Sequence, residues 1–157
     1  MKSLFFFVFS ILLFYSVQAQ TIKSVMETTW KGGSKARTEL TESGYFICIE
    51  KLYDIQYNED YDTFTGYSRT EFTLDNETYV SVMKISGTYN SSDFSVVISS
   101  DYSVRKDELP GGLYWIDTTI YLTLYSDEEH EGYYILSGKS SNMSYSDELY
   151  EVSDYPY

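Results

Sequence analysis

The most regular feature of the chain is an alternation of apolar and polar residues with a period of two. Residues 94–104, FSVVISSDYSV, place apolar side chains on one face: Phe94, Val96, Ile98, Tyr102 and Val104. Residues 113–125, LYWIDTTIYLTLY, alternate in the same way: Ile116, Ile120, Leu122 and Leu124. Successive side chains of a β-strand point to opposite faces of its sheet, so both stretches are predicted to be half-buried strands.

Less regular runs of the same kind recur along the chain. They lie at about residues 25–31, 45–53, 64–72, 78–86, 131–139 and 146–152. Turn-forming segments such as NSSD and SDEEHEG separate them, and at most one helical turn fits, within residues 34–40. The pattern predicts an all-β fold: an antiparallel up-and-down β-barrel of about eight strands, with a β-sandwich as the alternative. The run at 146–152 is expected to close the barrel.

A short glycine motif occurs three times, as FTGYS at 64–68, ISGTY at 85–89 and LSGKS at 136–140. A phosphate-binding loop needs Gly, Lys and Ser or Thr at fixed spacing, followed by a helix. None of the three copies meets that requirement, and each lies in strand-like sequence. We therefore interpret Gly66, Gly87 and Gly138 as architectural residues, at points where strands bend to curl the sheet.

The first 19 residues have the features of a secretory signal peptide. Lys2 precedes the apolar run LFFFVFSILLFYSV, which is short for a membrane span, and Val17-Gln18-Ala19 suits cleavage by a signal peptidase. Residues 20–157 are then expected to form a single soluble domain, secreted or periplasmic, with an acidic, Tyr-rich C-terminal tail.

Composition and charge narrow the range of partners. The 18 Tyr and 9 Phe suit a pleated, half-buried surface and so favour β structure. The formal net charge is −13, and it becomes −14 when Lys2 leaves with the leader. Such a charge repels nucleic acids and acidic membrane surfaces, and it favours a soluble monomer. No nucleic acid partner and no integral membrane segment are expected after cleavage.

Cys48 and Glu50 lie in the apolar stretch YFICIEKLY and are the first candidates for chemistry. Cys48 is the lone cysteine, so no internal disulfide can form; a small packed hydrophobe is favoured over a nucleophile or an intermolecular bridge. Glu50 is the best candidate for acid–base chemistry because its neighbours are apolar. A position on the rim or the outer face is favoured for it, with Lys51 on the face opposite to it.

Two acidic segments raise the question of a metal. Asn58, Asp60 and Asp62 alternate as calcium ligands do, but the Gly and Glu of an EF-hand loop are missing, which favours a solvated hairpin tip. His130 stands among carboxylates in SDEEHEG, without a second His or Cys at useful spacing for zinc. We therefore predict no metal site, no cofactor and no enzymatic activity.

Two segments, ISGTY at 85–89 and ILSG at 135–138, together with Trp30 and Gly32 near the start of the predicted domain, carry a family resemblance. With the meander of short strands, they make residues 24–152 resemble a lipocalin-like (calycin-like) β-barrel, and more narrowly small exported bacterial proteins of that pattern. The resemblance implies a closed barrel. It does not assign a ligand or binding residues, because fold alone does not fix function.

Aromatic side chains are the candidate ligand-binding residues: Trp30, Tyr114, Trp115, Tyr121 and Tyr133, with Tyr134 beside them. A barrel of about eight strands holds either packed side chains or one small ligand. The first hypothesis is therefore an exported barrel that binds a small apolar or amphipathic molecule. The alternative is a cell-envelope or surface interaction module that contacts protein or glycan, since Tyr combines an apolar body with a polar tip. The same rings are equally suited to filling the core or bracing the outside.

Overall fold

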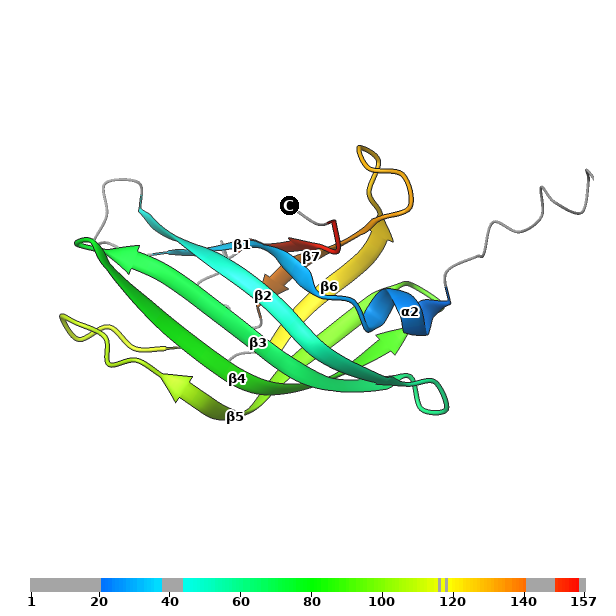
Figure 1. Ribbon diagram of the computed structural model, residues 1–157, viewed down its shortest axis with the longest axis horizontal. Helices are drawn as coiled ribbons and strands as arrows, with labels where there is room; N and C mark the ends of the chain where they lie inside the picture. Colours follow the sequence, from blue (N-terminus) through cyan, green and yellow to red (C-terminus); the bar gives the residue numbers. More distant parts are fainter. Residues whose placement is uncertain (1–20, 38–43, 116, 118, 141–148, 156–157) are drawn as a thin grey trace, which may run out of the picture.

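In the residues that the structure describes, one short helix is followed by eight strands that close into a barrel (Figure 1). The computed structural model describes residues 21–37, 44–115, 117, 119–140 and 149–155. The elements are α2 (Ile22–Met26), β1 (Trp30–Arg37), β2 (Tyr45–Asn58), β3 (Thr63–Leu74), β4 (Glu77–Asn90), β5 (Ser95–Lys106), β6 (Thr119–Ser126), β7 (Tyr134–Ser140) and β8 (Leu149–Ser153). The predicted all-β, up-and-down barrel of eight antiparallel strands is thus confirmed.

Closure of the barrel depends on the short strand β8. Each strand pairs antiparallel with the next, and β8 pairs with both β7 and β1. The β1–β8 ladder is only four residue pairs long, from Lys31 opposite Ser153 to Ser34 opposite Tyr150. The C-terminal run therefore closes the barrel, as its sequence predicted, and it leaves no free edge between the first and last strands.

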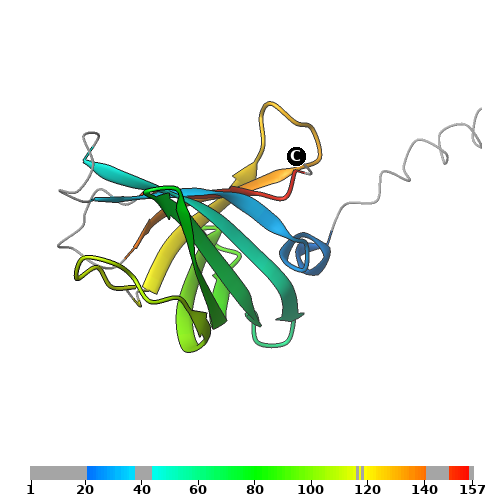
Figure 2. The ribbon, with the colours of Figure 1, turned by 60° about the vertical axis from the view of Figure 1, so that its left-hand side comes forward.

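One end of the barrel is filled by an apolar core and covered by α2 (Figures 1 and 2). Thr21 caps the helix: its Oγ1 accepts a hydrogen bond from the Ser24 backbone N–H at 3.2 Å. Val25 and Met26 of α2 are buried against the barrel interior, and Trp30 at the start of β1 is completely buried beside them. Among the described residues no helix is long and apolar enough to cross a membrane.

The repeated glycines lie within strands, where neighbouring backbone comes very close. A Cβ on Gly138 would lie 2.9 Å from the Cα of Leu122 and would meet the Tyr121 carbonyl oxygen; one on Gly87 would meet the Val97 carbonyl oxygen. No register shift occurs at either of these two glycines, whereas Gly66 lies opposite the β2–β3 register shift between Tyr53 and Gln56. Close approach between coiled strands is therefore what these positions require, which supports the architectural interpretation over a phosphate loop.

Register shifts elsewhere change the faces that alternation alone predicts. Two shifts between β4 and β5, at Val82/Met83 and Lys84/Ile85, turn the second half of β5. Tyr102 and Val104 were expected on the same inner face as Val96 and Ile98, but they are 59% and 57% exposed. The prediction for these two side chains was wrong because each extra residue in a bulge reverses the alternation.

Three further local expectations are corrected by the structure. Residues 113–115 and 117 are not in a strand: β6 begins at Thr119, after a loop in which Gly111 and Gly112 have positive φ. Phe94 has a positive φ and lies in the turn before β5. The helical turn lies at Ile22–Met26, where a strand was predicted from residue 25, and residues 34–37 belong to β1.

The turn between β6 and β7 is a polar turn that holds the chain near the C-terminus. Asp127 accepts hydrogen bonds from the backbone N–H of Glu129 and His130, and its Oδ2 lies 2.8 Å from His130 Nδ1. The hydrogen bond with His130 is the main cause that lowers the pKa of Asp127. The His130 ring stacks on Tyr155 with centroids 3.8 Å apart. The turn therefore stabilises this end of the barrel.

Candidate functional site

Away from α2, hydroxyl side chains appear on the inner face of the barrel. Residues directly opposite each other in an antiparallel ladder share a face, so cross-strand partners of core residues also point inward. Ser68 lies opposite Met83, Ser100 lies opposite Ile85, and both partners belong to the buried face of β4. Small hydroxyl side chains thus occupy inward positions next to the apolar core that fills the half of the barrel beside α2.

Glu50 is the buried charge of this half. It is only 4% exposed, and its two carboxylate oxygens accept hydrogen bonds from Ser34 Oγ and Thr70 Oγ1, both at 2.7 Å. These donors come from the strands on either side, β1 and β3. The expectation of a rim or outward position for Glu50 was wrong. Lys51 does lie on the opposite, outer face, as predicted, over the Tyr53 ring.

The side chains around Glu50 explain why its face could not be assigned from sequence. Cys48 and Leu52 share its inner face and are buried, so Cys48 is a packed side chain of the interior. Ile47 and Ile49, although equally apolar, point outward and are exposed. The stretch YFICIEKLY is apolar on both faces, and alternation therefore carried no information about which face was inside.

We expect Glu50→Ala to lower the free energy of unfolding by about 2 kcal/mol, because the Ser34 and Thr70 hydroxyls lose a buried acceptor. Glu50→Gln is the matched control, since its side-chain oxygen can still accept from one of the two hydroxyls and its shape is retained. Urea denaturation followed by tryptophan fluorescence measures both variants. Equal stabilities of Glu50→Ala and the wild type would contradict a structural role for these hydrogen bonds.

An aromatic cluster lies at the same end of the barrel, around Phe72. The Phe72 ring centroid is 4.9 Å from that of Phe46, 5.5 Å from that of Tyr79 and 5.5 Å from that of Trp115. Trp115 is half-buried, and its indole N–H donates to the Asp107 carbonyl oxygen at 2.9 Å. We call these four residues the aromatic rim. The rim joins β2, β3 and β4 to the loop after β5.

At this end of the barrel, the wall is incompletely paired between β5 and β6. The two strands pair only over five positions, with Ser95–Ser99 of β5 opposite Thr119–Thr123 of β6. Beyond Ser99, β5 continues to Lys106 while paired with β4 alone. Lys106 Nζ instead forms an ion pair with Asp117 Oδ1 at 2.7 Å, which ties the intervening loop to the strand. Because the described residues of β5 and β6 do not pair beyond Ser99, we call the end opposite α2 the open end of the barrel.

The aromatic residues singled out from sequence do not form one face. Trp30 is a core residue beside α2, and Trp115 belongs to the aromatic rim. Tyr114, in the same loop, is 69% exposed, and Tyr121 is 55% exposed on the outer wall of β6. Tyr133 packs edge-on against Tyr155 at the opposite end of the barrel, with centroids 4.9 Å apart. Tyr134 packs against the core.

Sequence reasoning missed Phe46, Phe72 and Tyr79 of the rim. They lie near strand ends. Alternation could have indicated their face: Phe72 lies two residues beyond Thr70 in the same strand and so shares its inner face. Tyr79 lies opposite Phe72 in the β3–β4 ladder. Register between strands was needed to bring them together, and the sequence alone did not supply it.

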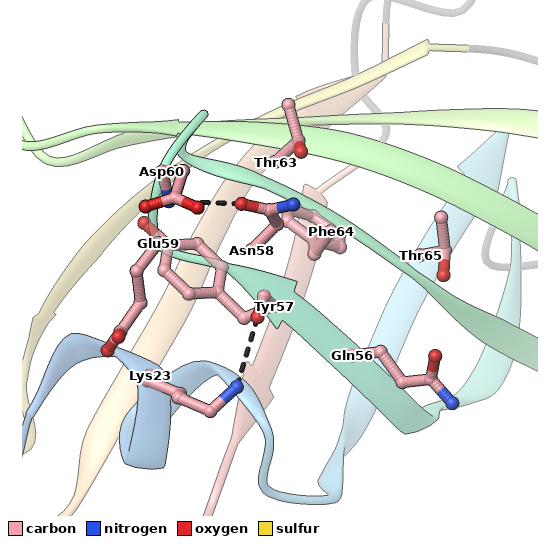
Figure 3. Close-up of a pocket in the computed structure, with 9 residues that line it drawn as sticks. All are labelled: Lys23, Gln56, Tyr57, Asn58, Glu59, Asp60, Thr63, Phe64 and Thr65. Carbon is pink, nitrogen blue, oxygen red and sulfur yellow. Dashed lines mark hydrogen bonds between the residues drawn. The ribbon is translucent and has the colours of Figure 1, made fainter.

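A second, polar pocket opens on the outside near α2 and the β2–β3 turn (Figure 3). Lys23 Nζ there donates to the Tyr57 carbonyl oxygen at 3.1 Å, and the Asp60 backbone N–H donates to Asn58 Oδ1 at 3.0 Å. Asp62 Oδ1 accepts from the Tyr57 hydroxyl at 2.6 Å, which raises the pKa of Tyr57 together with the larger effect of burial.

Of the three side chains considered as calcium ligands, Asn58 and Asp62 thus accept hydrogen bonds within the hairpin, and Asp60 takes part through its backbone N–H. The predicted hairpin is confirmed: β2 ends at Asn58 and β3 begins at Thr63. Within the described ranges, no group of three or more His, Cys, Asp or Glu residues could hold a metal ion. The polar pocket near α2 is therefore a weaker candidate for a ligand-binding site than the open end.

Comparison with known proteins adds no relative to this picture: no family model, no curated protein and no solved structure matches the chain. The class of protein is therefore defined by its fold alone, a closed, eight-stranded antiparallel β-barrel consistent with a lipocalin-like fold.

Proposed function

We propose that the protein is an exported small-ligand-binding β-barrel whose ligand, an apolar or amphipathic molecule, enters the open end. The observation that carries the proposal is the division of the inner face. The apolar core and α2 fill one half, whereas Ser34, Ser68, Thr70 and Ser100 occupy inward positions between that core and the aromatic rim.

This part of the barrel interior suits a ligand in both its space and its polar groups. The interior of an eight-stranded barrel is just wide enough to be filled by side chains or to hold one small ligand, so small side chains leave room that large ones take. Small-molecule sites combine apolar and aromatic walls with a few placed polar groups. The aromatic rim supplies the first feature, and the hydroxyls around Glu50 supply the second.

The leader-like first 19 residues and the lipocalin-like pattern support the same proposal. A carrier of apolar molecules is useful outside the cytoplasm, where such molecules must cross water. The high negative charge would keep the carrier soluble there. Membership among exported bacterial lipocalin-like proteins is part of this proposal.

Titration with the neutral fluorescent probe N-phenyl-1-naphthylamine tests the site. We expect saturable binding by residues 20–157, with Kd in the micromolar range, about −8 kcal/mol. Trp115→Ala should weaken binding roughly tenfold because it removes one wall of the aromatic rim. Tyr114→Ala is the matched control: it changes the adjacent, exposed residue of the same loop and should leave Kd unchanged. Equal Kd values for the wild type and both variants would place the probe elsewhere and contradict the proposal.

A further inference from the structure

A row of cations crosses the outer wall of the barrel, on the face of β1, β2 and β3 opposite to the one that carries Glu50 and Thr70. The ladders place Lys31 of β1 opposite Lys51 of β2, and Lys51 opposite Arg69 of β3. The row continues from Arg69 through Val82 of β4 to Arg105 of β5. We call Lys31, Lys51, Arg69 and Arg105 the basic row. With strands about 4.8 Å apart, it runs about 19 Å along the wall, perpendicular to strands that lie side by side in Figure 1.

This arrangement costs stability unless an anion offsets it, because like charges directly opposite each other in a sheet repel. Arg69 forms an ion pair with Glu71 on the same strand, and Arg105 forms one with Asp107, which directly follows β5. Glu71 lies on the open-end side of the row, as does Asp107. Within the part of the chain that the structure describes, Lys31 and Lys51 form no ion pair.

Tyrosines form a second row beside the cations. Tyr53 and Tyr67 stack with centroids 5.6 Å apart and an interplanar angle of 25°. Lys51 Nζ lies 5.0 Å from the Tyr53 centroid, and Lys84 Nζ lies 4.6 Å from the Tyr67 centroid. Tyr102, opposite Lys84 in the β4–β5 ladder, is exposed. The tyrosines hold two lysines in place on the wall and leave their charge unneutralised.

The basic row is positively charged, whereas the net charge of the whole protein is negative. The chain carries 24 acidic and 11 basic residues, yet the row itself holds four cations and no carboxylate; Glu71 and Asp107 pair with its arginines, and the exposed Asp101 and Glu151 lie beside it on the wall. A locally positive face on a strongly acidic protein gathers anions while the rest of the molecule repels them, which orients an anionic partner onto that face.

We propose that the basic row and its tyrosines form a docking surface for a linear anionic polysaccharide, one that carries carboxylates on successive sugars. A flexible linear chain can follow a row of cations that curves with the wall of the closed barrel, and sugar rings match tyrosines, which combine an apolar ring with a hydroxyl. A lipid surface would need a broad apolar face, and a duplex nucleic acid would bring the acidic flanks of the barrel against its phosphates. The surface lies outside the barrel and acts independently of the proposed interior ligand.

Binding to polygalacturonate oligomers, followed by fluorescence anisotropy at low salt, tests this surface. The wild-type chain, residues 20–157, should bind, and the affinity should fall as salt is raised because the contacts are exposed ion pairs. The double variant Lys51→Gln/Arg69→Gln should weaken binding by roughly tenfold, since exposed charge contacts contribute up to about 1 kcal/mol each. The control Lys23→Gln/Lys139→Gln makes the same change in charge on α2 and β7, away from the row, and should retain most of the affinity.

The outcomes separate clearly. Loss in the double variant with retention in the control supports the proposal. No binding by the wild type, or the same loss in both variants, overturns it. Equal binding of single-stranded DNA of the same charge, or of vesicles rich in anionic lipid, would also overturn the assignment to a polysaccharide. Circular dichroism of each variant establishes that the barrel is folded.

Discussion

Trp30→Ala is expected to lower the free energy of unfolding by about 4 kcal/mol, the largest effect of any side-chain truncation considered for this barrel. Trp30 is completely buried at the junction of α2 and β1, and its indole N–H lies 3.5 Å from the Met26 carbonyl oxygen. Its loss would leave a cavity beneath the helix and a space that neighbouring strands cannot close without moving. Guanidinium chloride denaturation measures the change.

Trp115→Ala is the matched control for this experiment, because it removes the same side chain from the half-buried aromatic rim. We expect it to cost about 1 kcal/mol, in line with one lost aromatic contact and part of the buried area. The two tryptophans are thus predicted to divide their roles: Trp30 stabilises the fold, and Trp115 contributes to binding. Equal destabilisation by the two substitutions would contradict this division.

Gly32→Ala is expected to lower the free energy of unfolding by about 3 kcal/mol and to separate β1 from β8, the two strands that close the barrel. A Cβ on Gly32 would lie 2.7 Å from the Cα of Val152 and would meet the Glu151 carbonyl oxygen. Both obstacles are backbone atoms of β8, so no rotamer change can relieve the clash. Since the β1–β8 ladder has only four residue pairs, a local shift there affects the whole closure.

The neighbouring residue supplies the control. A Cβ on Gly33 would lie 3.1 Å from the Cys48 carbonyl oxygen, a tight contact that a small backbone adjustment relieves. We expect Gly33→Ala to change the free energy of unfolding by less than about 1 kcal/mol. Hydrogen exchange of β8 amides should rise in Gly32→Ala and stay slow in Gly33→Ala. Slow exchange in both variants would contradict the prediction that Gly32→Ala disrupts the β1–β8 ladder.

The fold could be predicted from sequence because its main determinant is local. Alternation identified the strand stretches that contain Val96, Ile98, Leu122 and Leu124, all of which are buried inside the barrel. The errors arose where the determinant is not local. Bulges turned Tyr102 and Val104 outward, and a β5–β6 loop replaced the first part of an expected strand. A bulge depends on the facing strand and has no signature in its own alternation.

The candidate site could be predicted only in part, for a related reason. Trp115 was identified as aromatic and available, and Glu50 as an unusual carboxylate, but their partners come from other strands. Ser34 and Thr70 are hydroxyl residues in ordinary strand sequence, and only the register places them at Glu50. The basic row is a stronger example, because its four cations are spread over residues 31–105 and align only across the ladders.

The central claim, that the open end of the barrel binds a small apolar or amphipathic molecule, is tested most directly by native mass spectrometry. Residues 20–157 are incubated with a total lipid extract, separated from free lipid without detergent, and measured under native and denaturing conditions. We expect one added mass per chain under native conditions, lost on denaturation and reduced in Trp115→Ala but not in Tyr114→Ala. The apo mass alone, for the wild type in excess extract, would contradict it.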